Sequence, residues 1–307
     1  MDQGAFRILS LDGGGSKGVY TLGVLREIEA LAGCRLYETF DLIYGTSTGA
    51  IIGALLALGA SVDDITKAYF ELIPDVMQYR RRHRRSAALK RNLEAVFGEK
   101  GFDAFLVDIG IVATHYDNAR PMIFKMSVAQ AHGRRSTFVP GFGCTIAAAL
   151  LSSTAAFPFF ERATVKTANQ GEPEVMDGGF VANNPTLFAI ADAVKAYGKM
   201  LQELKVLSLG VGHYKEPQRS MYYRALFSLW PFYLTAKVLE TSTNTIEQLR
   251  SILFREVATV RIDDSFPQKE YETDLLEADR EKLVKLNSLG RESFARQERE
   301  LKVVFGW

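Results

Sequence analysis

The sequence predicts an α/β fold in which a mostly parallel, buried sheet is flanked by helices. Apolar runs of strand length recur along the chain, and segments with helical periodicity separate them, which is the alternation expected of strand–helix–strand units. The 307 residues are 47% hydrophobic and 24% charged, which is ordinary globular composition with enough apolar residues for a sizeable core. These observations exclude collagen-like, low-complexity and disordered chains.

The predicted strands are short runs rich in apolar and β-branched residues, at Phe6–Leu11, Phe40–Tyr44, Gly110–Thr114, Pro121–Met126, Glu174–Met176, Val206–Leu209 and Val257–Ile262. The helices predicted between them are Val19–Leu31, Ala50–Leu58, Asp63–Leu72, Thr145–Ser152 and Pro185–Tyr197. Near the end, Glu277–Lys285 and Arg291–Leu301 mix charges of both signs and indicate a solvated helical cap. We expect residues 1–215 to form a core and residues 216–307 to complete the same domain.

Charge and cysteine content limit the possible partners and location. The net charge is +1, so a polycation that coats DNA is not expected. Two cysteines cannot form a disulfide framework, and the four histidines show no metal-ligand spacing. The first residues carry an acid, Asp2, where a signal peptide needs a base, so we expect a cytoplasmic protein. Two uncharged stretches, Leu42–Val62 and Ser136–Phe160, are long enough to cross a bilayer, but their composition favours a buried strand that continues into a helix.

A glycine-rich run follows the first predicted strand and opens the first predicted helix. It comprises Gly13, Gly14, Gly15, Ser16, Lys17 and Gly18. Glycines allow positive φ, so several backbone N–H groups can converge at a helix N-terminus and hold an anion there. The spacing also matches the dinucleotide-binding fingerprint, with Asp41 near the position of a ribose-binding acid. An oxyanion hole, a phosphate cradle and an ordinary tight turn remain open at this point.

A second motif, G-x-S-x-G, lies between the strand Phe40–Tyr44 and the helix that follows. It consists of Gly45, Thr46, Ser47, Thr48 and Gly49. A serine on such a sharp turn stands clear of the sheet, and the glycines avoid collisions with neighbouring backbone. The N-terminus of the next helix favours an alkoxide and the acyl oxyanion that forms from it. The pattern predicts Ser47 as a nucleophile, and a dinucleotide enzyme has no need of it.

A third motif places a carboxylate in a glycine turn after a short strand, at Asp177, Gly178 and Gly179. Asp177 is compatible with a general base, the orienting acid of a triad, or an Asx turn, and its spacing does not decide among them. His213 follows it and completes the chain order Ser, Asp, His of an α/β-hydrolase triad. The remaining histidines, which have no context that fixes a role, are His83, His115 and His132.

Taken together, the motifs Asp12–Gly18, Gly45–Gly49 and Asp177–Gly179 closely resemble those of the patatin-like phospholipases. Lesser marks of that family accompany them, at Ser152–Pro158, Asn183–Pro185 and Ser208–Gly212. The resemblance covers about Phe6 to Gly212 and fades beyond Lys215, except for a late strand at Thr259–Ile262.

This resemblance implies a three-layer patatin-like fold with a mostly parallel central sheet flanked by helices, in which residues 1–215 are the catalytic core. It implies that Ser47 is the nucleophile and Asp177 the base of a Ser–Asp dyad. The backbone N–H groups of Gly13–Gly18 would form the oxyanion hole, and no metal or redox cofactor would be needed. Lys17 stands where many members of the family have arginine.

Two further stretches bear on substrate and control. A basic run has no acid within it and includes Arg80, Arg81, Arg82, Arg84 and Arg85. It favours lipid head groups or a nucleotide phosphate as partner, although a solvated basic face is equally compatible. The stretch Ala225–Ala236, rich in aromatic residues and leucine, is compatible with an acyl-pocket wall, a lid or plain core packing.

The sequence therefore predicts a cytoplasmic phospholipase that acts peripherally on membrane phospholipid. Some bacterial patatin-like enzymes are antiphage effectors switched on by cyclic oligonucleotides, and the compact size of this chain is similar, so a cyclic-nucleotide activator is expected. The alternatives are a soluble-ester esterase with a Ser47–Asp177–His213 triad and a dinucleotide-binding oxidoreductase. Acyl position, head-group preference and oligomeric state are left open.

Overall fold

The computed structural model describes residues 4–133, 135–215 and 229–307, excluding the side chains of residues 229–233. Its main element is an eight-stranded sheet with strand order β5-β6-β3-β2-β1-β7-β9, and β4 pairs with β3 outside this path. These strands are β1 (Phe6–Leu11), β2 (Leu42–Thr46), β3 (Asp108–His115), β4 (Arg120–Lys125), β5 (Ala163–Thr164), β6 (Glu174–Asp177), β7 (Leu204–Leu209) and β9 (Ala258–Ile262). A second small sheet joins β8 (His213–Tyr214) to β10 (Ser265–Phe266).

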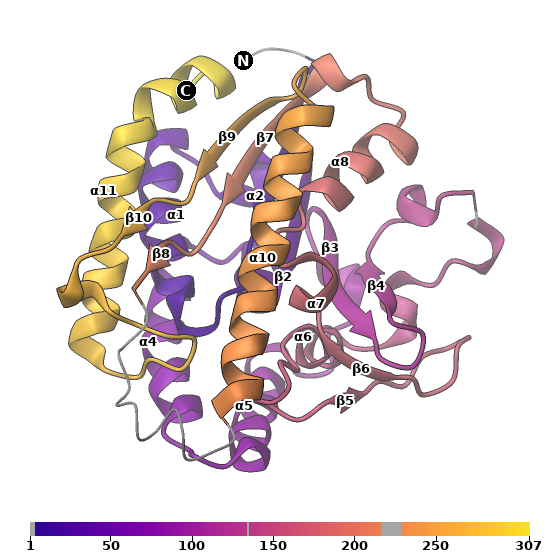
Figure 1. Ribbon diagram of the computed structural model, residues 1–307. Coiled ribbons are helices and arrows are strands. Elements are labelled where there is room, and N and C mark those ends of the chain that lie inside the picture. The colour runs from indigo at the N-terminus through magenta and orange to yellow at the C-terminus, as the bar shows by residue number, and fades with distance from the viewer. Residues whose placement is uncertain (1–3, 134, 216–228) are drawn as a thin grey trace.

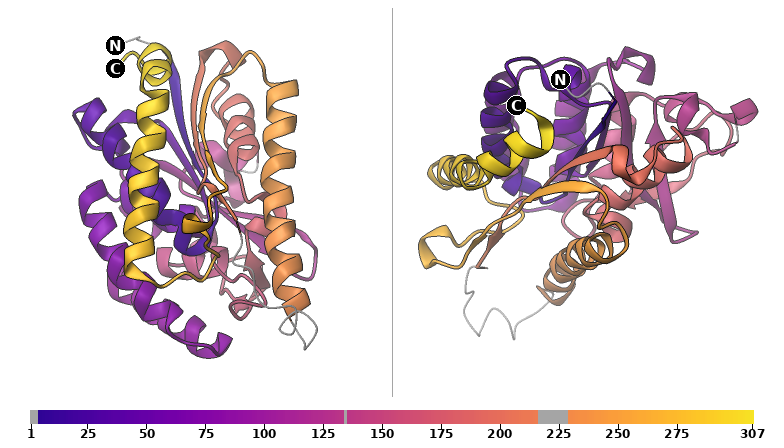
Figure 2. Two further views of the ribbon diagram at one scale, coloured as in Figure 1. Left: turned by 60° about the vertical axis from the view of Figure 1, so that its left-hand side comes forward. Right: turned by 90° about the horizontal axis from the view of Figure 1, so that it is seen from above.

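Helices cover both faces of the main sheet, which gives three layers (Figures 1 and 2). The larger apolar core lies between the sheet and the helices α1 (Gly18–Ala32), α3 (Thr48–Ala57), α4 (Val62–Met77), α5 (Arg82–Phe97), α6 (Ile146–Ser153) and α11 (Arg280–Phe305). The smaller core lies on the opposite face, under α7 (Gly179–Ala182), α8 (Thr186–Lys195) and α10 (Leu229–Leu253). A short helix, α2 (Leu36–Thr39), precedes β2.

The parallel centre of the sheet is the part that the sequence pattern predicted most directly. β2, β1, β7 and β9 pair in parallel with their neighbours, and β3 joins them on the other side of β2. Their residues are apolar on both faces because helices cover both. The antiparallel additions, β4 and β6, both pair with β3. The predicted α/β fold with a mostly parallel central sheet is confirmed.

The end of the chain differs from the predicted solvated helical cap. Residues 280–305 form one continuous helix, α11, which Asp279 caps by accepting hydrogen bonds from the N–H groups of Glu281 and Lys282. One face of α11 is buried, because the helix runs along α1 at a very short separation (Figure 2). A Cβ atom on Gly290 would lie 2.1 Å from the Tyr20 carbonyl oxygen. The mixed charges lie on the outward face of α11, and the buried inward face was not predicted.

The first uncharged stretch folds as the predicted strand and buried helix, whereas in the second only the predicted helix is present and 3-10 turns stand in place of the strand. Leu42–Val62 contains β2 and α3, and Ser136–Phe160 contains α6. Among the described residues, no single helix is both long and apolar enough to cross a membrane. One bent pair, Arg135–Gly143 with Ile146–Ser153, reaches that length and composition only when its two parts are taken together across an 81° bend. Of the stretch Ala225–Ala236, residues 225–228 and the side chains of residues 229–233 lie outside what the structure describes, and the backbone from residue 229 begins α10 (Leu229–Leu253).

Candidate active site

Ser47 stands on a strained turn between β2 and α3. Its φ is 53° and its ψ is −120°, which is an unusual conformation for a residue with a side chain. The turn is held by a relay in which the Ser47 N–H donates to Ser153 Oγ at 2.9 Å and Ser153 Oγ donates to the Val112 carbonyl at 2.6 Å. Gly49 is required because a Cβ there would lie 2.3 Å from the Leu11 carbonyl oxygen. Strain and relay together fix the direction of the Ser47 hydroxyl.

The register of β3 brings Asp177 to Ser47. Thr46, the last residue of β2, pairs with Val112, and Asp177, the last residue of β6, pairs with Ala113. Since β4 occupies the other edge of β3, both strands end against the same edge, at consecutive positions. Ser47 and Asp177 therefore line one cavity.

Asp177 lies in a buried, weakly satisfied environment. Its side chain is 1% exposed, and Oδ1 accepts a hydrogen bond from the Gly179 N–H at 2.7 Å. Oδ2 is buried and accepts no hydrogen bond of ordinary geometry from a described residue. Burial raises the pKa of Asp177 to about 6, while the Gly179 N–H and the Ser47 hydroxyl act in the opposite direction. The carboxylate is thus ionised near neutral pH but more basic than an exposed aspartate.

The glycine-rich run offers only two uncommitted backbone donors. The Gly13, Ser16, Lys17 and Gly18 N–H groups all donate to carbonyl oxygens of the protein. The N–H groups of Gly14 and Gly15 donate to no described residue, and both glycines line the cavity with Ser47. Gly15 has φ 59° and touches the backbone of Leu275, where a Cβ would lie 2.4 Å from the carbonyl oxygen. The structure narrows the predicted six-residue anion site to these two donors.

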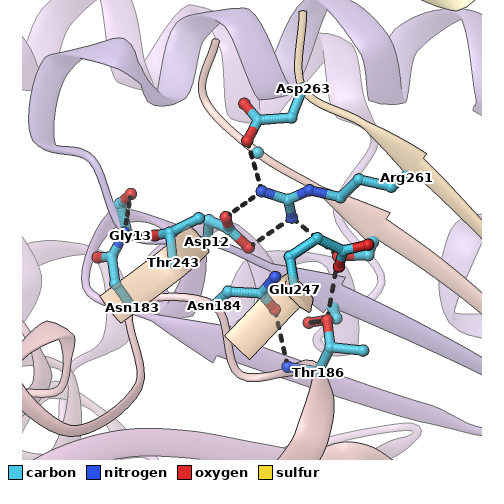
Figure 3. A network of polar contacts seen from close by, with 12 residues as sticks. Asp12, Gly13, Asn183, Asn184, Thr186, Thr243, Glu247, Arg261 and Asp263 are labelled. Atoms are coloured by element: carbon cyan, nitrogen blue, oxygen red, sulfur yellow. Dashed lines mark hydrogen bonds and ion pairs between the residues drawn. The ribbon is translucent and has the colours of Figure 1, made fainter. Parts of the chain in front are cut away.

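A buried ion-pair network holds the residue that precedes the glycine-rich run (Figure 3). The sequence pattern did not predict this network. Arg261, on β9, forms a bidentate pair with Asp12, with Nη1 2.9 Å from Oδ1 and Nη2 2.6 Å from Oδ2. The same guanidinium contacts Asp263 Oδ2 at 2.5 Å and Ser208 Oγ at 2.8 Å. Asp12 directly precedes the glycines, so the pair fixes the start of their run. The partners are far apart in sequence, and only the late strand Thr259–Ile262 indicated that Arg261 mattered.

A second brace comes from α10. The Asn183 side-chain amide donates to the Gly13 carbonyl at 3.2 Å and to Thr243 Oγ1 at 2.7 Å. The Gly13 N–H in turn donates to the Asn183 carbonyl at 3.0 Å. Figure 3 shows Asn183 between the glycine run and Thr243. The segment Asn183–Pro185, a lesser mark in the sequence, therefore couples α10 to the predicted oxyanion run.

The histidine of the alternative triad is engaged elsewhere. His213 Nε2 lies 3.1 Å from Asp263 Oδ2, and this hydrogen bond raises the pKa of His213. His213 is not among the residues that line the cavity of Ser47 and Asp177. The structure thus does not assemble the Ser47–Asp177–His213 triad. Nor does Asp41 approach the glycine run, because it precedes β2 and accepts from the Arg7 N–H at 2.7 Å, at the opposite end of the strands. The dinucleotide interpretation is therefore wrong.

The cavity beyond Ser47 is lined almost entirely by apolar side chains. It contains about 680 Å³ of empty space, counting the part open to solvent, and extends between α4, α5 and the loop after α6. Its apolar lining includes Ile51, Leu72, Ile73, Val76, Met77, Leu89, Phe159, Phe160, Leu275 and Leu276. Among the described residues, no group of three or more His, Cys, Asp and Glu side chains is arranged to hold a metal ion. The space suits a hydrocarbon chain whose reacting end lies at Ser47.

The basic run divides into two parts. Arg85 is buried, with Nη1 donating to the Phe159 carbonyl at 2.7 Å and Nη2 to the Tyr79 carbonyl at 2.8 Å. Its predicted contact with an external anion is therefore wrong, since it braces the cavity wall. The exposed members, which form no ion pair with a residue that the structure describes, are Arg80, Arg81, Arg82 and Arg84. The Arg82 guanidinium lies over the Phe157 ring, 5.1 Å from its centroid.

The chain is similar in sequence to known phospholipases. The profile of the family described as "Patatin-like phospholipase" matches residues 9–190. The chain is 51% identical over 296 residues to a cUMP-AMP-activated phospholipase of Escherichia coli, covering 96% of this chain and 92% of that protein. It is 27% identical over 311 residues to a cGAMP-activated phospholipase of Vibrio cholerae serotype O1, covering 86% and 82%. Among solved structures, VipD from Legionella pneumophila aligns with a TM-score of 0.49 at 13% identity, over 98% of this chain and 67% of VipD.

Replacing Arg261 by methionine is expected to lower the free energy of unfolding by about 3–5 kcal/mol, because Asp12 and Asp263 would stay buried without their cation. Chemical denaturation of the purified variant measures this. The matched control is Arg291→Met, whose ion pair with Glu27 is exposed and should contribute less than about 1 kcal/mol. Equal losses in the two variants would show that the Asp12–Arg261 pair is not a special anchor.

Proposed function

The chain belongs to the patatin-like phospholipase family, and on that premise we propose that it hydrolyses phospholipid acyl esters through a Ser47–Asp177 dyad. The observation that carries the proposal is the meeting of three groups at one cavity. They are a strained serine, a buried carboxylate, and the two N–H groups of Gly14 and Gly15. Among the residues that the structure describes, none hydrogen-bonds to the carboxylate Oδ2 or accepts from these two N–H groups. The apolar extension of the cavity supplies the place for the acyl chain.

In the proposed acylation step, Ser47 Oγ attacks the ester carbonyl carbon and its proton passes to Asp177 Oδ2. The carbonyl oxygen becomes an oxyanion, which the Gly14 and Gly15 N–H groups bind. Collapse of this intermediate breaks the ester bond, and Asp177 returns the proton to the departing glycerol oxygen. Water then attacks the acyl-enzyme with Asp177 again as the base, which releases the fatty acid and regenerates Ser47.

The pKa of Asp177 explains how a lone carboxylate can serve as the base. An exposed aspartate, with a pKa of 3.8, is a weak acceptor for a serine proton, and a pKa of about 6 improves the match while leaving the group ionised at pH 7. The oxyanion donors must supply the rest of the stabilisation. Losing one such donor costs about 2.7–4 kcal/mol in enzymes that use them, so the anchoring of Asp12 by Arg261 serves the chemistry as well as the fold.

The exposed arginines indicate how the enzyme meets its substrate. They lie at the start of α5, the helix that contributes Leu89 to the apolar cavity. Phe157, 40% exposed, lies beneath Arg82, and Leu234 on α10 is 45% exposed, while Thr235 Oγ1 donates to the Phe157 carbonyl at 3.5 Å. Basic and apolar side chains on one surface favour anionic head groups and the acyl boundary of a bilayer. We propose peripheral binding through this surface.

The relatives also support control by a nucleotide. Two of them are named for activation by cyclic dinucleotides, cUMP-AMP and cGAMP. A phospholipase without control would attack the membrane of its own cell. The proposal therefore extends to a cyclic-dinucleotide-activated antiphage effector, with the membrane as its target.

Release of fatty acid from mixed phospholipid vesicles tests the dyad. With cUMP-AMP present, the wild type should release fatty acid, while Ser47→Ala and Asp177→Asn should each lose at least about a thousandfold in rate, since each removes a group that acts in the transition state. His213→Ala is the control and should stay within a few-fold of the wild type. A collapse of activity in His213→Ala would contradict the dyad.

The rate on a soluble ester should depend on pH through Asp177. The carboxylate must be deprotonated to accept the serine proton, so kcat/KM should fall about tenfold per pH unit below about 6 and level off above it. A pH profile of kcat/KM on a short-chain ester measures this. An inflection near the ordinary aspartate value of 3.8 would show that the base is not desolvated.

Reversing the exposed arginines should weaken membrane binding without changing the chemistry. The variant Arg80→Glu/Arg81→Glu/Arg84→Glu should bind anionic vesicles roughly 100-fold more weakly, at about 1 kcal/mol per basic residue removed. Cosedimentation with vesicles measures binding, and hydrolysis of a soluble ester should be retained. The matched control reverses three exposed charges on α11, as Arg280→Glu/Lys285→Glu/Arg299→Glu. Equal binding losses in both variants would mean that the surface near α5 has no special role.

A further inference from the structure

A second cavity lies on the far side of β3 from the active-site serine, in the lobe formed by residues 120–143 and 165–171. This is the magenta and pink region that projects beside β3 and β4 in Figure 1. The cavity holds about 750 Å³ of empty space, counting the part open to solvent, and neither Ser47 nor Asp177 lines it. Side chains of mixed chemistry surround it, among them Lys125, Gln130, Phe138, Phe142, Asn169 and Gln170.

The lining of this second cavity is more polar than that of the acyl cavity, and a nucleotide requires polar partners for its bases and phosphates. Phe138 and Phe142 are half-buried, and both line the cavity. Aromatic side chains are the groups on which planar bases stack. Asn169 and Gln170 are exposed amides at the opposite wall, and each can donate to and accept from the edge of a base. Lys125 supplies a cation at the floor. Rings, amides and a cation within one cavity match the three parts of a nucleotide.

The electrostatic setting also favours a phosphate. From Arg120 to Phe160 the sequence contains no Asp or Glu, and its cationic residues are Arg120, Lys125, Arg134 and Arg135. The acid that faces the floor is Asp192, on α8, which is 2% exposed and lies 2.6 Å from Lys125 Nζ. Its other contacts are Gln130 Nε2 at 3.1 Å, the Tyr44 hydroxyl at 2.5 Å and His132 Nε2 at 2.5 Å.

Asp192 has two partners on each oxygen, with Lys125 and His132 at Oδ1 and Tyr44 and Gln130 at Oδ2. If Lys125 turns to a phosphate, Asp192 keeps Tyr44, Gln130 and His132, so the buried carboxylate is not left without a partner. These remaining hydrogen bonds would lower the cost of exchanging the internal ion pair of Lys125 for an external anion.

We propose that this cavity binds the cyclic dinucleotide that activates the enzyme. The inference rests on the proposed function for the existence of such an activator, and it adds the place where the activator binds. The amide and aromatic side chains would hold the two bases, and Lys125 would face a phosphate.

Three chain connections link the cavity to the catalytic groups. Tyr44, bound to Asp192, lies on β2 three residues before Ser47. The wall that contains Phe138 and Phe142 continues into α6, whose Ser153 receives the Ser47 N–H. The wall that contains Asn169 and Gln170 continues into β6, which ends at Asp177. A ligand that draws these walls together would act on the nucleophile and the base at the same time.

Calorimetric titration of the full chain with cUMP-AMP, and separately with cGAMP, tests the assignment. Asn169→Ala/Gln170→Ala should bind the effective nucleotide at least roughly tenfold more weakly, because at least two hydrogen bonds are lost, and so should Lys125→Met. The matched control is Asn244→Ala/Gln248→Ala, an exposed amide pair on α10, which should bind as the wild type does. Thermal unfolding without ligand checks that each variant is folded. If Lys125→Met does not fold, the double amide variant still tests the site, because it changes exposed positions alone.

The possible results distinguish a failure of the proposed nucleotide site from a failure of the proposed function. Wild-type binding with specific loss in the two cavity variants supports the assignment. Wild-type binding that the folded cavity variants retain overturns the site while activation by a nucleotide stands. If the wild type binds neither nucleotide yet hydrolyses phospholipid without them, both the site and the proposed regulation fail, and the hydrolase survives.

Discussion

The catalytic arrangement depends on one edge of β3, which two strands of opposite direction share. β2 runs parallel to β3 and ends opposite Val112, and β6 runs antiparallel and ends opposite Ala113. Their carboxyl ends therefore meet, and the residues at the meeting point are Ser47 and Asp177. Gly178 is needed at this junction because a Cβ there would lie 2.2 Å from the Val112 carbonyl oxygen. Gly49 of the serine motif allows a separate close approach, since a Cβ there would lie 2.3 Å from the Leu11 carbonyl oxygen on β1.

The burial of Asp177 and the strained turn at Ser47 lower the stability of the fold, and the same two features make the site reactive. Asp177 is buried and forms no ion pair with any residue in the described part of the chain, so its ionised form is disfavoured and its pKa lies above that of a free aspartate. The strained φ of Ser47 adds a further cost. The Ser153 relay holds the strained turn at Ser47, and the buried pair of Asp12 with Arg261 holds the adjacent glycine run. The rigid frame lies in the sheet, and the reactive groups lie where its strands end.

Sequence patterns predicted the parts of this structure that local spacing determines. Apolar runs located the central strands, and the glycine motifs located Ser47, Asp177 and the run that lies beside them. Contacts between distant segments could not be predicted in this way. Nothing local shows that Arg261 pairs with Asp12 or that Arg85 turns inward from an otherwise exposed basic run. Nor does it show that, within the glycine run, the N–H groups of Gly14 and Gly15 are the two that donate to no residue the structure describes. These facts follow from packing, in which one residue of a uniform pattern finds a partner far along the chain.

The central claim is that Ser47 reacts covalently because Asp177 accepts its proton. Labelling with a fluorophosphonate, followed by peptide mass analysis, tests it directly. The account predicts one adduct on the peptide that contains Ser47, and labelling at least a hundredfold slower in Asp177→Asn, since an amide cannot accept the proton. An adduct on another residue, or labelling of Asp177→Asn at the wild-type rate, would contradict it.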